Sequence, residues 1–302
     1  VFDSNSNKVV IAYKDGGNGD DGTAVVGTVS GTSISFGSPV VFDGPTARVT
    51  RVSATFDSTN NKVVIAYKND SSSNRGFAIV GTVSGTSISF GAIASVTGFA
   101  IDGINALYDP TSQKTVVVYN DPNDSYKADA VVGTVSGTSI SFGSPVVLYD
   151  GTSGANNLSS VAVESLGKIL VTFRNIFGSK NAFGYVGTVS GSSITFGSST
   201  TLNTDENAYG YVTYDTVADK FVYAYQYDTA PEAGKILTGV ISGDAFVVET
   251  SSEFNSGESG FPNLVPDSNA GKVVLSYRNS SDSNRGTSQV LQNGYLSTNL
   301  TS

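Results

Sequence analysis

The chain has 302 residues without cysteine or histidine, which excludes disulfide scaffolds, zinc–thiolate sites, thiol nucleophiles and Ser-His-Asp triads. Its net charge of −9 argues against nucleic-acid binding by phosphate neutralisation and against attraction to an anionic membrane. No apolar stretch approaches the ~18 residues of a membrane span, so we expect no membrane insertion. The 34 glycines, with abundant Ser, Thr, Val and Asn, indicate an all-β chain with many turns.

An internal repeat dominates the sequence. The segment VGTVSGTSISFG occurs unchanged at 26–37, 80–91 and 132–143, and with two changes at 186–197. A second marker, a lysine followed by an apolar run ending in an aromatic residue, recurs every 52 or 54 residues. The six marker lysines are Lys8, Lys62, Lys114, Lys168, Lys220 and Lys272. Six markers predict six repeats.

The second repeat shows the predicted elements in chain order. An extended run over 48–57 ends in a turn at 57–61, and the segment 62–68 (KVVIAYK) is too short and too β-branched for a helix. A polar loop over 69–75 precedes a third strand over 76–83, and a turn at 84–86 leads to a fourth over 87–96. Four short strands at even spacing are typical of a propeller blade.

We therefore predict an all-β fold, a six-bladed β-propeller with four antiparallel strands per blade and a repeat of about 52–54 residues. The repeat is too long for a solenoid coil and too short for an immunoglobulin-like sandwich. The prediction has one domain over 1–302, with blades at about 1–45, 46–97, 98–150, 151–203, 204–254 and 255–302.

The two ends of the chain differ from the inner repeats. Val1–Asp3 matches only the last three residues of a first strand, so we expect a shortened inner strand there. The last repeat carries its own third and fourth strands over 287–292 and 295–300, joined by an Asn-Gly turn at 293–294. We therefore expect the first and last blades to meet by side-chain packing.

An acidic residue ends most first strands, and an Asp there can bind backbone N–H groups two residues on. A structural role is favoured, since six copies of one catalytic acid have no chemical use. The positions are Asp3, Asp57, Asp109, Glu164, Asp215 and Asp267.

The segment VGTVSGTSISFGSPVV at 26–41 resembles the Asp-box hairpin of sialidase-like propellers, where a strand runs into Ser-x-Asp-x-Gly-x-Thr-Trp. Here the Asp is missing and Phe36 stands for the Trp. Sialidases hold the substrate carboxylate with three arginines and use a Tyr/Glu pair and an Asp. No motif places three of this chain's arginines together, so the resemblance implies the architecture more than the activity. The arginines are Arg48, Arg51, Arg75, Arg174, Arg278 and Arg285.

The ending GYLSTNLTS resembles junction segments in repeat-rich tail or fibre proteins of marine bacteriophages. This resemblance implies a phage or environmental origin. It also implies a location outside the cell or on the virion surface.

The residues directly after each second-strand aromatic form the candidate binding site. They open the loops between second and third strands, whose sequences differ while the scaffold repeats, as in binding loops. Long hydrogen-bonding side chains there suit sugars or an extended polar partner. Ordinary solvated strand ends are the competing interpretation. The candidate ligand-binding residues are Lys14, Lys68, Asn120, Arg174, Gln226 and Arg278.

One loop has oxygen ligands at a spacing that suits calcium, namely Asp15, Asn18, Asp20 and Asp21. It lacks the residue order and terminal Glu of an EF-hand, and a solvated glycine-rich hairpin loop is the simpler interpretation. We predict no cofactor and no metal, with calcium in this loop as the alternative.

The predicted function is a non-catalytic binding or structural propeller that recognises a glycan or protein partner through loops on one face. The alternative is a diverged sialidase-like glycosidase or polysaccharide lyase. Without His or Cys, catalysis would need a carboxylate pair or a Tyr/Arg-based site. The six glutamates fall mostly in the last third of the chain, which does not favour an active site built from several blades.

Overall fold

The computed structural model describes residues 1–292 and 295–296. Within them the regular elements are strands and four short 3-10 helices, η1 (Gly16–Asn18), η2 (Asp70–Ser72), η3 (Glu164–Leu166) and η4 (Ser280–Asp282). No helix of this described part is long and apolar enough to cross a membrane. The chain groups into two compact units, Val1–Asp150 with Val189–Ile194 and Gly151–Thr188 with Thr195–Ser302. The single domain over 1–302 stays a prediction.

The second repeat shows how each blade is built. Its inner strand β6 (Val49–Asp57) pairs with β7 (Lys62–Asn69), which pairs with β8 (Arg75–Ser84), all antiparallel. These three strands match the predicted ones within two residues. The fourth strand is interrupted at 91–93, so that β9 (Ser87–Phe90) pairs with the end of β8 and β10 (Ala94–Ala100) with its start.

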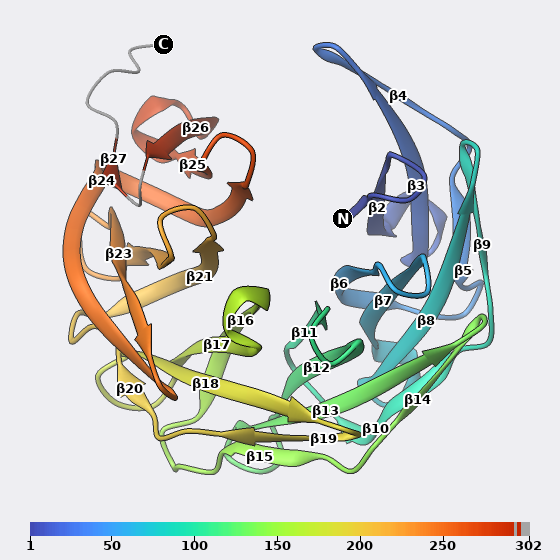
Figure 1. Cartoon of the computed structure of the whole chain (residues 1–302), viewed down its shortest axis with the longest axis horizontal. Helices are drawn as coiled ribbons and strands as arrows, with labels where there is room; N and C mark the ends of the chain where they lie inside the picture. The colour runs from blue at the N-terminus through green and yellow to red at the C-terminus, as the bar shows by residue number, and fades with distance from the viewer. Residues whose placement is uncertain (293–294, 297–302) are drawn as a thin grey trace. The chain divides into compact units, whose positions relative to one another are not determined.

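The first unit contains three sheets of this plan, which Figure 1 shows in chain order. As predicted, the inner strand of the first sheet is short, with two residues only. The first sheet holds β1 (Phe2–Asp3), β2 (Lys8–Asp15), β3 (Asp21–Ser30), β4 (Ser33–Phe36) and β5 (Val40–Asp43). The third holds β11 (Ile104–Asp109), β12 (Lys114–Asp121), β13 (Lys127–Ser136), β14 (Ser139–Phe142) and β15 (Val146–Tyr149).

The second unit begins with a sheet of the same plan, although the tip of its outer hairpin, residues 189–194, groups with the first unit. This sheet holds β16 (Ala155–Val163), β17 (Lys168–Asn175), β18 (Ala182–Ser190), β19 (Ser193–Phe196) and β20 (Thr200–Thr201). The last sheet has seven strands, β21 (Asn207–Asp215), β22 (Lys220–Tyr227), β23 (Ala233–Ser242), β24 (Ala245–Asp267), β25 (Lys272–Asn279), β26 (Arg285–Gln292) and β27 (Tyr295–Leu296).

The prediction of six blades is wrong, because the described strands form five sheets. The reason is β24, which runs for 23 residues from the outer strand of the fifth repeat into the inner strand of the sixth. Glu258 still pairs with Ala233, and the next residue, Ser259, already pairs with Asn279. No turn separates the two repeats, so one sheet contains both. The predicted Asn-Gly turn at 293–294 and the segment 297–302 lie outside the described residues.

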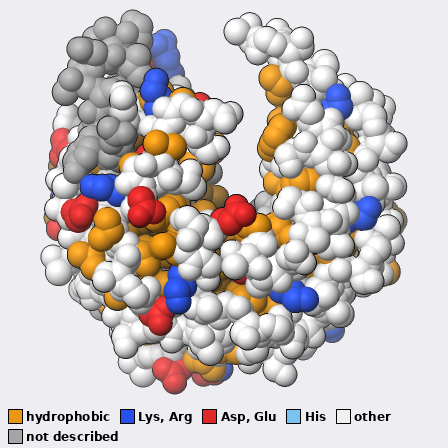
Figure 2. Space-filling model, in the orientation of Figure 1, with side chains coloured by type: hydrophobic (Ala, Val, Ile, Leu, Met, Phe, Trp, Pro, Cys, Tyr) orange, Lys and Arg blue, Asp and Glu red, His pale blue; other side chains and the backbone are white. Residues whose placement is uncertain are grey.

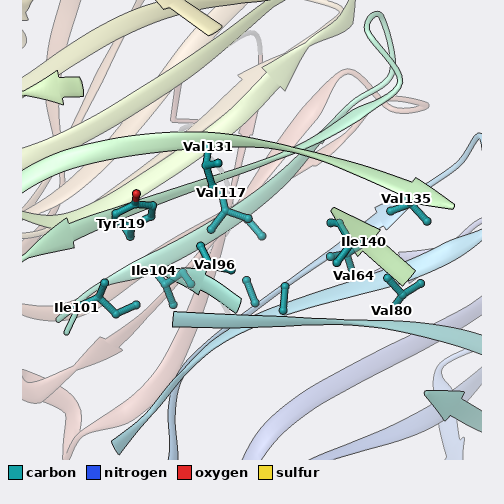
Figure 3. Packing of buried hydrophobic residues seen from close by; sticks show 13 residues of the cluster. Val64, Val80, Val96, Ile101, Ile104, Val117, Tyr119, Val131, Val135 and Ile140 are labelled. Carbon is teal, nitrogen blue, oxygen red and sulfur yellow. The ribbon is translucent and has the colours of Figure 1, made fainter. Parts of the chain in front are cut away.

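Apolar side chains on both faces of the middle strands make the core. Figure 3 shows one cluster, in which Val64 and Val80 of the second repeat pack with Val117, Tyr119 and Ile140 of the third. The first four of these side chains are fully buried. Burying a Val or Ile side chain contributes roughly 1.5–3 kcal/mol, so these β-branched runs hold neighbouring sheets of the first unit together.

The acid that ends each inner strand has the structural role predicted for it. Asp57 accepts hydrogen bonds from the backbone N–H groups of Thr59 and Asn60, at 3.1 and 2.9 Å. Equivalent bonds are made by Asp3, Asp109, Asp215 and Asp267. The fourth repeat departs from this pattern. There Val163 pairs with Lys168 as Asp57 does with Lys62, and Glu164 begins η3.

A serine on the inner strand connects consecutive sheets. The Oγ of Ser53 accepts a hydrogen bond from the N–H of Ala106 at 3.0 Å, in the first unit. The Oγ of Ser159 accepts one from the N–H of Val212, also at 3.0 Å, in the second. Each bond contributes only about 1 kcal/mol. Its main effect is to fix the position of one inner strand relative to the next.

Glycines at the end of the outer hairpin fix the spacing between neighbouring sheets. A Cβ on Gly91 would lie 1.9 Å from the carbonyl oxygen of Thr138, and one on Gly37 would lie 1.9 Å from that of Thr86. Backbone oxygens cannot move aside as a flexible side chain can. Any larger residue at these positions must push the adjacent hairpin away.

We therefore expect Gly91→Ala to lower the free energy of unfolding by about 1–3 kcal/mol, the range for overpacking. Gly98→Ala is the matched control, because a Cβ there would meet no atom within 4 Å. It should change stability by less than ~0.5 kcal/mol. Urea unfolding of both variants measures the difference, and equal stabilities would show that the close approach does not constrain the sheets.

Candidate ligand-binding site

The six predicted site residues occupy one position of the repeat. Each lies near the end of a second strand and pairs with a small residue at the start of the third, as Lys14 does with Gly22 and Arg174 with Ala182. Three lie in the first unit and three in the second. On the face drawn in Figure 2, charged side chains stand singly or in small groups among uncharged ones.

In the first unit these side chains have local partners. The ammonium of Lys14 lies 3.1 Å from Asp20, and the hydrogen bond from Lys14 lowers the pKa of the Asp20 carboxyl. The ammonium of Lys68 lies 3.2 Å from Asp70. Asn120 is fully buried and its side-chain oxygen accepts a hydrogen bond from the N–H of Gly103. Asn120 therefore orders the start of an inner strand.

The three residues of the second unit are likewise engaged. Arg174 donates to the carbonyl of Asn207 at 2.6 Å. The amide of Gln226, which is buried, donates to Glu232 at 2.6 Å. These bonds secure the connections around the strand ends, while Arg174 Nε and Gln226 Oε1 have no hydrogen-bond partner.

Arg278 is placed differently from the other two. Its guanidinium donates to Glu258 at 2.9 Å and lies 5.2 Å from the ring centroid of Phe261. Arg278 therefore packs against the ring of Phe261, which lines the aromatic cavity described below. That the six residues together bind a ligand stays a prediction.

A second row of residues, which no sequence motif indicated, lies on the inner strands. Pairing of β6 with β7 shifts between Thr50 and Ser53, which leaves residues 51–52 as a bulge outside the regular ladder. Similar shifts occur in β16, β21 and β24. We call the residue six positions before the end of each inner strand the bulge position. Its occupants are Arg51, Gly103, Asn157, Tyr209 and Phe261.

Three of the five residues at the bulge position have an uncommon backbone conformation. The φ angles of Arg51, Asn157 and Phe261 are 51°, 52° and 54°, in the left-handed region. A residue with a Cβ pays roughly 1–2 kcal/mol there, although Asn pays less because its side chain bonds locally. Strain of this kind concentrates where a side chain has to be displayed in a set direction.

Two cavities open at the bulge position, one in each unit. The basic cavity, in the first unit, has a volume of about 480 Å³ and is lined by Lys14, Thr50, Arg51, Val52, Lys68 and Asp70. It contains two of the predicted site residues. The aromatic cavity, in the second unit, has a volume of about 260 Å³ and is lined by Asn157, Leu158, Tyr209, Gly210, Tyr211, Phe261, Pro262 and Asn263.

The aromatic cavity presents two exposed rings beside amide groups. The rings of Tyr209 and Phe261 are 37% and 55% exposed, with centroids 4.4 Å apart. The side chain of Asn157 donates to the carbonyl of Ala208, which anchors it beside them. Burial raises the pKa of Tyr211, and its phenol can both donate and accept hydrogen bonds.

The proposed calcium loop is built from bonds within the protein. Asp15 accepts a hydrogen bond from the N–H of Gly17 at 3.0 Å, and Asp21 accepts one from Asn18 at 3.1 Å. Asp20 faces Lys14. Among the residues that the structure describes, no group of three or more carboxylate side chains is placed to hold a metal ion.

No family model matches the chain, and no curated protein matches it. Among solved structures, the BP39L lectin from Burkholderia pseudomallei is similar, with a TM-score of 0.63 and 8% identity over 98% of this chain and 83% of the lectin. Trypanosoma rangeli sialidase has a TM-score of 0.55 and 10% identity over 93% of this chain. A leech intramolecular trans-sialidase complexed with 2,7-anhydro-Neu5Ac has a TM-score of 0.57 and 9% identity over 96% of this chain.

The chain spans 52% of the Trypanosoma enzyme and 66% of the leech enzyme. At such low identity these likenesses show the fold, a β-propeller that a lectin and sialidases share. They give no support to a phage origin or a virion-surface location, which stay predictions.

The left-handed backbone at the bulge position predicts how substitutions of Arg51 change the free energy of unfolding. Arg51→Asn should be as stable as the native chain or up to ~1 kcal/mol more stable. Arg51→Val should be about 1–2 kcal/mol less stable than Arg51→Asn, because β-branched residues fit the left-handed region worst. Arg285→Val is the control, an exposed arginine on a regular strand. Urea unfolding checks the order, and an Arg51→Val variant as stable as Arg51→Asn would contradict it.

Proposed function

We propose that this propeller is a non-catalytic binding module that recognises a glycan, and that the aromatic cavity of the second unit holds one sugar ring. The observation that carries the proposal is the pair of exposed rings, Tyr209 and Phe261, set beside the amides of Asn157 and Asn263. Sugars have apolar C–H faces that pack on aromatic rings, and hydroxyl edges that need donors and acceptors. Binding pockets combine apolar walls with a few such polar groups.

The likeness to other propellers supports the same proposal. One of them is a lectin, and the leech enzyme was solved with a sugar derivative bound. The basic cavity, at about 480 Å³, lies within the usual size range of ligand pockets, and both cavities include residues of the inner strands.

The side chains around the cavities support binding without hydrolysis. Most glycosidases use two carboxyl groups about 5–9.5 Å apart on either side of the scissile bond, and sialidases use a Tyr/Glu pair with an Asp. Among the described residues that line the two cavities, the single carboxylate is Asp70. It accepts from Thr50 at 3.0 Å and lies 3.2 Å from Lys68. A pair of acids around one ligand is missing from these linings.

We expect the protein to bind a subset of neutral oligosaccharides on a glycan array, and Phe261→Asn to lower the affinity for them at least tenfold, or about 1.4 kcal/mol. Asn is the residue at the same position of the fourth repeat, with nearly the same φ, so the fold should be kept. Tyr209→Ala should have a similar effect.

Isothermal titration measures these affinities. Phe36→Ala is the matched control, because this ring is 51% exposed and belongs to β4 in the other unit. No binding to any glycan, or equal affinities for native protein and Phe261→Asn, would refute the assignment.

We also expect no hydrolysis of the glycans bound or of simple aryl glycosides, because the cavities lack paired acids. Release of reducing sugar is the measurement. Turnover that disappears on changing one acid, for example Asp70→Asn, would instead establish the alternative, a diverged sialidase-like glycosidase or lyase.

A further inference from the structure

The basic cavity has a different chemistry from the aromatic one, although it opens at the same position of the repeat. Its polar wall comes from three strands, with Lys14 on β2, Thr50 and Arg51 on β6, and Lys68 on β7. Arg51 stands at the bulge position that Phe261 occupies in the second unit. The bulge position therefore presents a cation in the first unit and an aromatic ring in the second.

The cavity is locally positive in a chain whose net charge is −9. Its lining has three cations and one carboxylate. Each lining cation pairs with a carboxylate, and Arg48 also pairs with Asp20. Together these groups are four cations and three carboxylates. These are Lys14, Arg48, Arg51 and Lys68 against Asp20, Asp70 and Asp102. An anion repelled by most of the protein surface meets a local attraction here.

Arg51 and Lys14 are the exposed cations of this cavity, whereas the side chain of Lys68 is 15% exposed and pairs with Asp70. The guanidinium of Arg51 is 60% exposed and lies 3.6 Å from Asp102, beyond a good hydrogen-bond distance. Lys14 is nearly half exposed. Exposed pairs of this kind contribute only about 0.2–1 kcal/mol, so an incoming oxyanion can share the cations at small cost. The carboxylate of Asp70 is occupied by Thr50 and Lys68.

We propose that the basic cavity is a second ligand site, which binds a sugar carrying a tetrahedral oxyanion, as a sulfate or phosphate ester. Two ammonium groups and a guanidinium on three different strands offer donors from several directions. A group with three terminal oxygens can accept from all of them, whereas a planar carboxylate is best satisfied by one bidentate arginine. A volume of about 480 Å³ holds a sugar ring as well as its anionic group.

This inference rests on the proposed function in one respect, that the ligand is a saccharide. It adds that the residue at the bulge position selects the ligand, an anionic sugar at Arg51 and an uncharged ring face at Phe261. The two sites can therefore be tested separately on the intact chain.

The experiment is titration with a sulfated dextran oligosaccharide, the unsulfated oligosaccharide of equal length, an oligogalacturonate, glucose 6-phosphate and inorganic sulfate. The sulfated oligosaccharide should bind at least tenfold more tightly than the unsulfated one. Its affinity should fall between 50 and 300 mM salt, because added salt screens exposed charges. Binding of glucose 6-phosphate that also depends on Arg51 would extend the site to phosphate esters.

Variants then locate the site. Arg51→Asn should lower the affinity for the sulfated probe at least fivefold, and Arg51→Lys should restore most of it. Arg285→Gln removes an exposed arginine from a regular strand and should change nothing. Circular dichroism of each variant checks that the fold is kept.

Several results would overturn the inference. They are no binding of the sulfated probe, binding unaffected by Arg51→Asn, tighter binding of the oligogalacturonate, or inorganic sulfate binding as tightly as the sulfated sugar. If neutral glycans still bind through Phe261 in that case, the proposed function stands and only this site is lost. If sulfated sugars bind through Arg51 and no neutral glycan binds, the aromatic cavity has been misassigned instead.

Discussion

The contact between consecutive inner strands is the constraint on which the rest of this structure depends. Ser53 and Ser159 each accept a hydrogen bond from the backbone of the next inner strand, at equivalent places in the two units. Glycines such as Gly91 set the distance between neighbouring hairpins. Sheets fixed at both places keep a constant separation. The two-residue bulge that directly precedes the serine is therefore held at a defined position beside the next sheet.

Variation at one position on such a scaffold changes ligand chemistry without changing the fold. Arg51 and Phe261 share a repeat position and nearly the same φ, yet one lines a basic cavity and the other an aromatic one. The residues around them follow the same division, with lysines beside Arg51 and a tyrosine beside Phe261. The strain of a left-handed arginine or phenylalanine, roughly 1–2 kcal/mol each, is small against the burial energy of the valine-rich middle strands.

The sequence predicted the strands of the blade well, because alternation, turn acids and the 52–54-residue period are local signals. It did not predict five sheets. Whether the extended segment 245–267 bends between two repeats depends on its pairing partners on β23 and β25, which no local pattern encodes. The strand-end residues lie at one position of the repeat, and their side chains make bonds within the protein, as Asn120 does; that they bind a ligand stays a prediction. The bulge position carries no repeated sequence motif. Five different residues stand six positions before the strand end, and the inner-strand sequences around them also differ from repeat to repeat.

The central claim is that side chains at the bulge position contact the ligand. A crystal structure of the protein with a bound oligosaccharide tests it most directly. The account predicts a sugar ring packed within about 4 Å of Phe261 and Tyr209, with its hydroxyl groups toward Asn157 and Asn263. A sugar bound instead on the outer hairpins, around the Ser-Gly-Thr turn at 30–32 or its repeats, would contradict it.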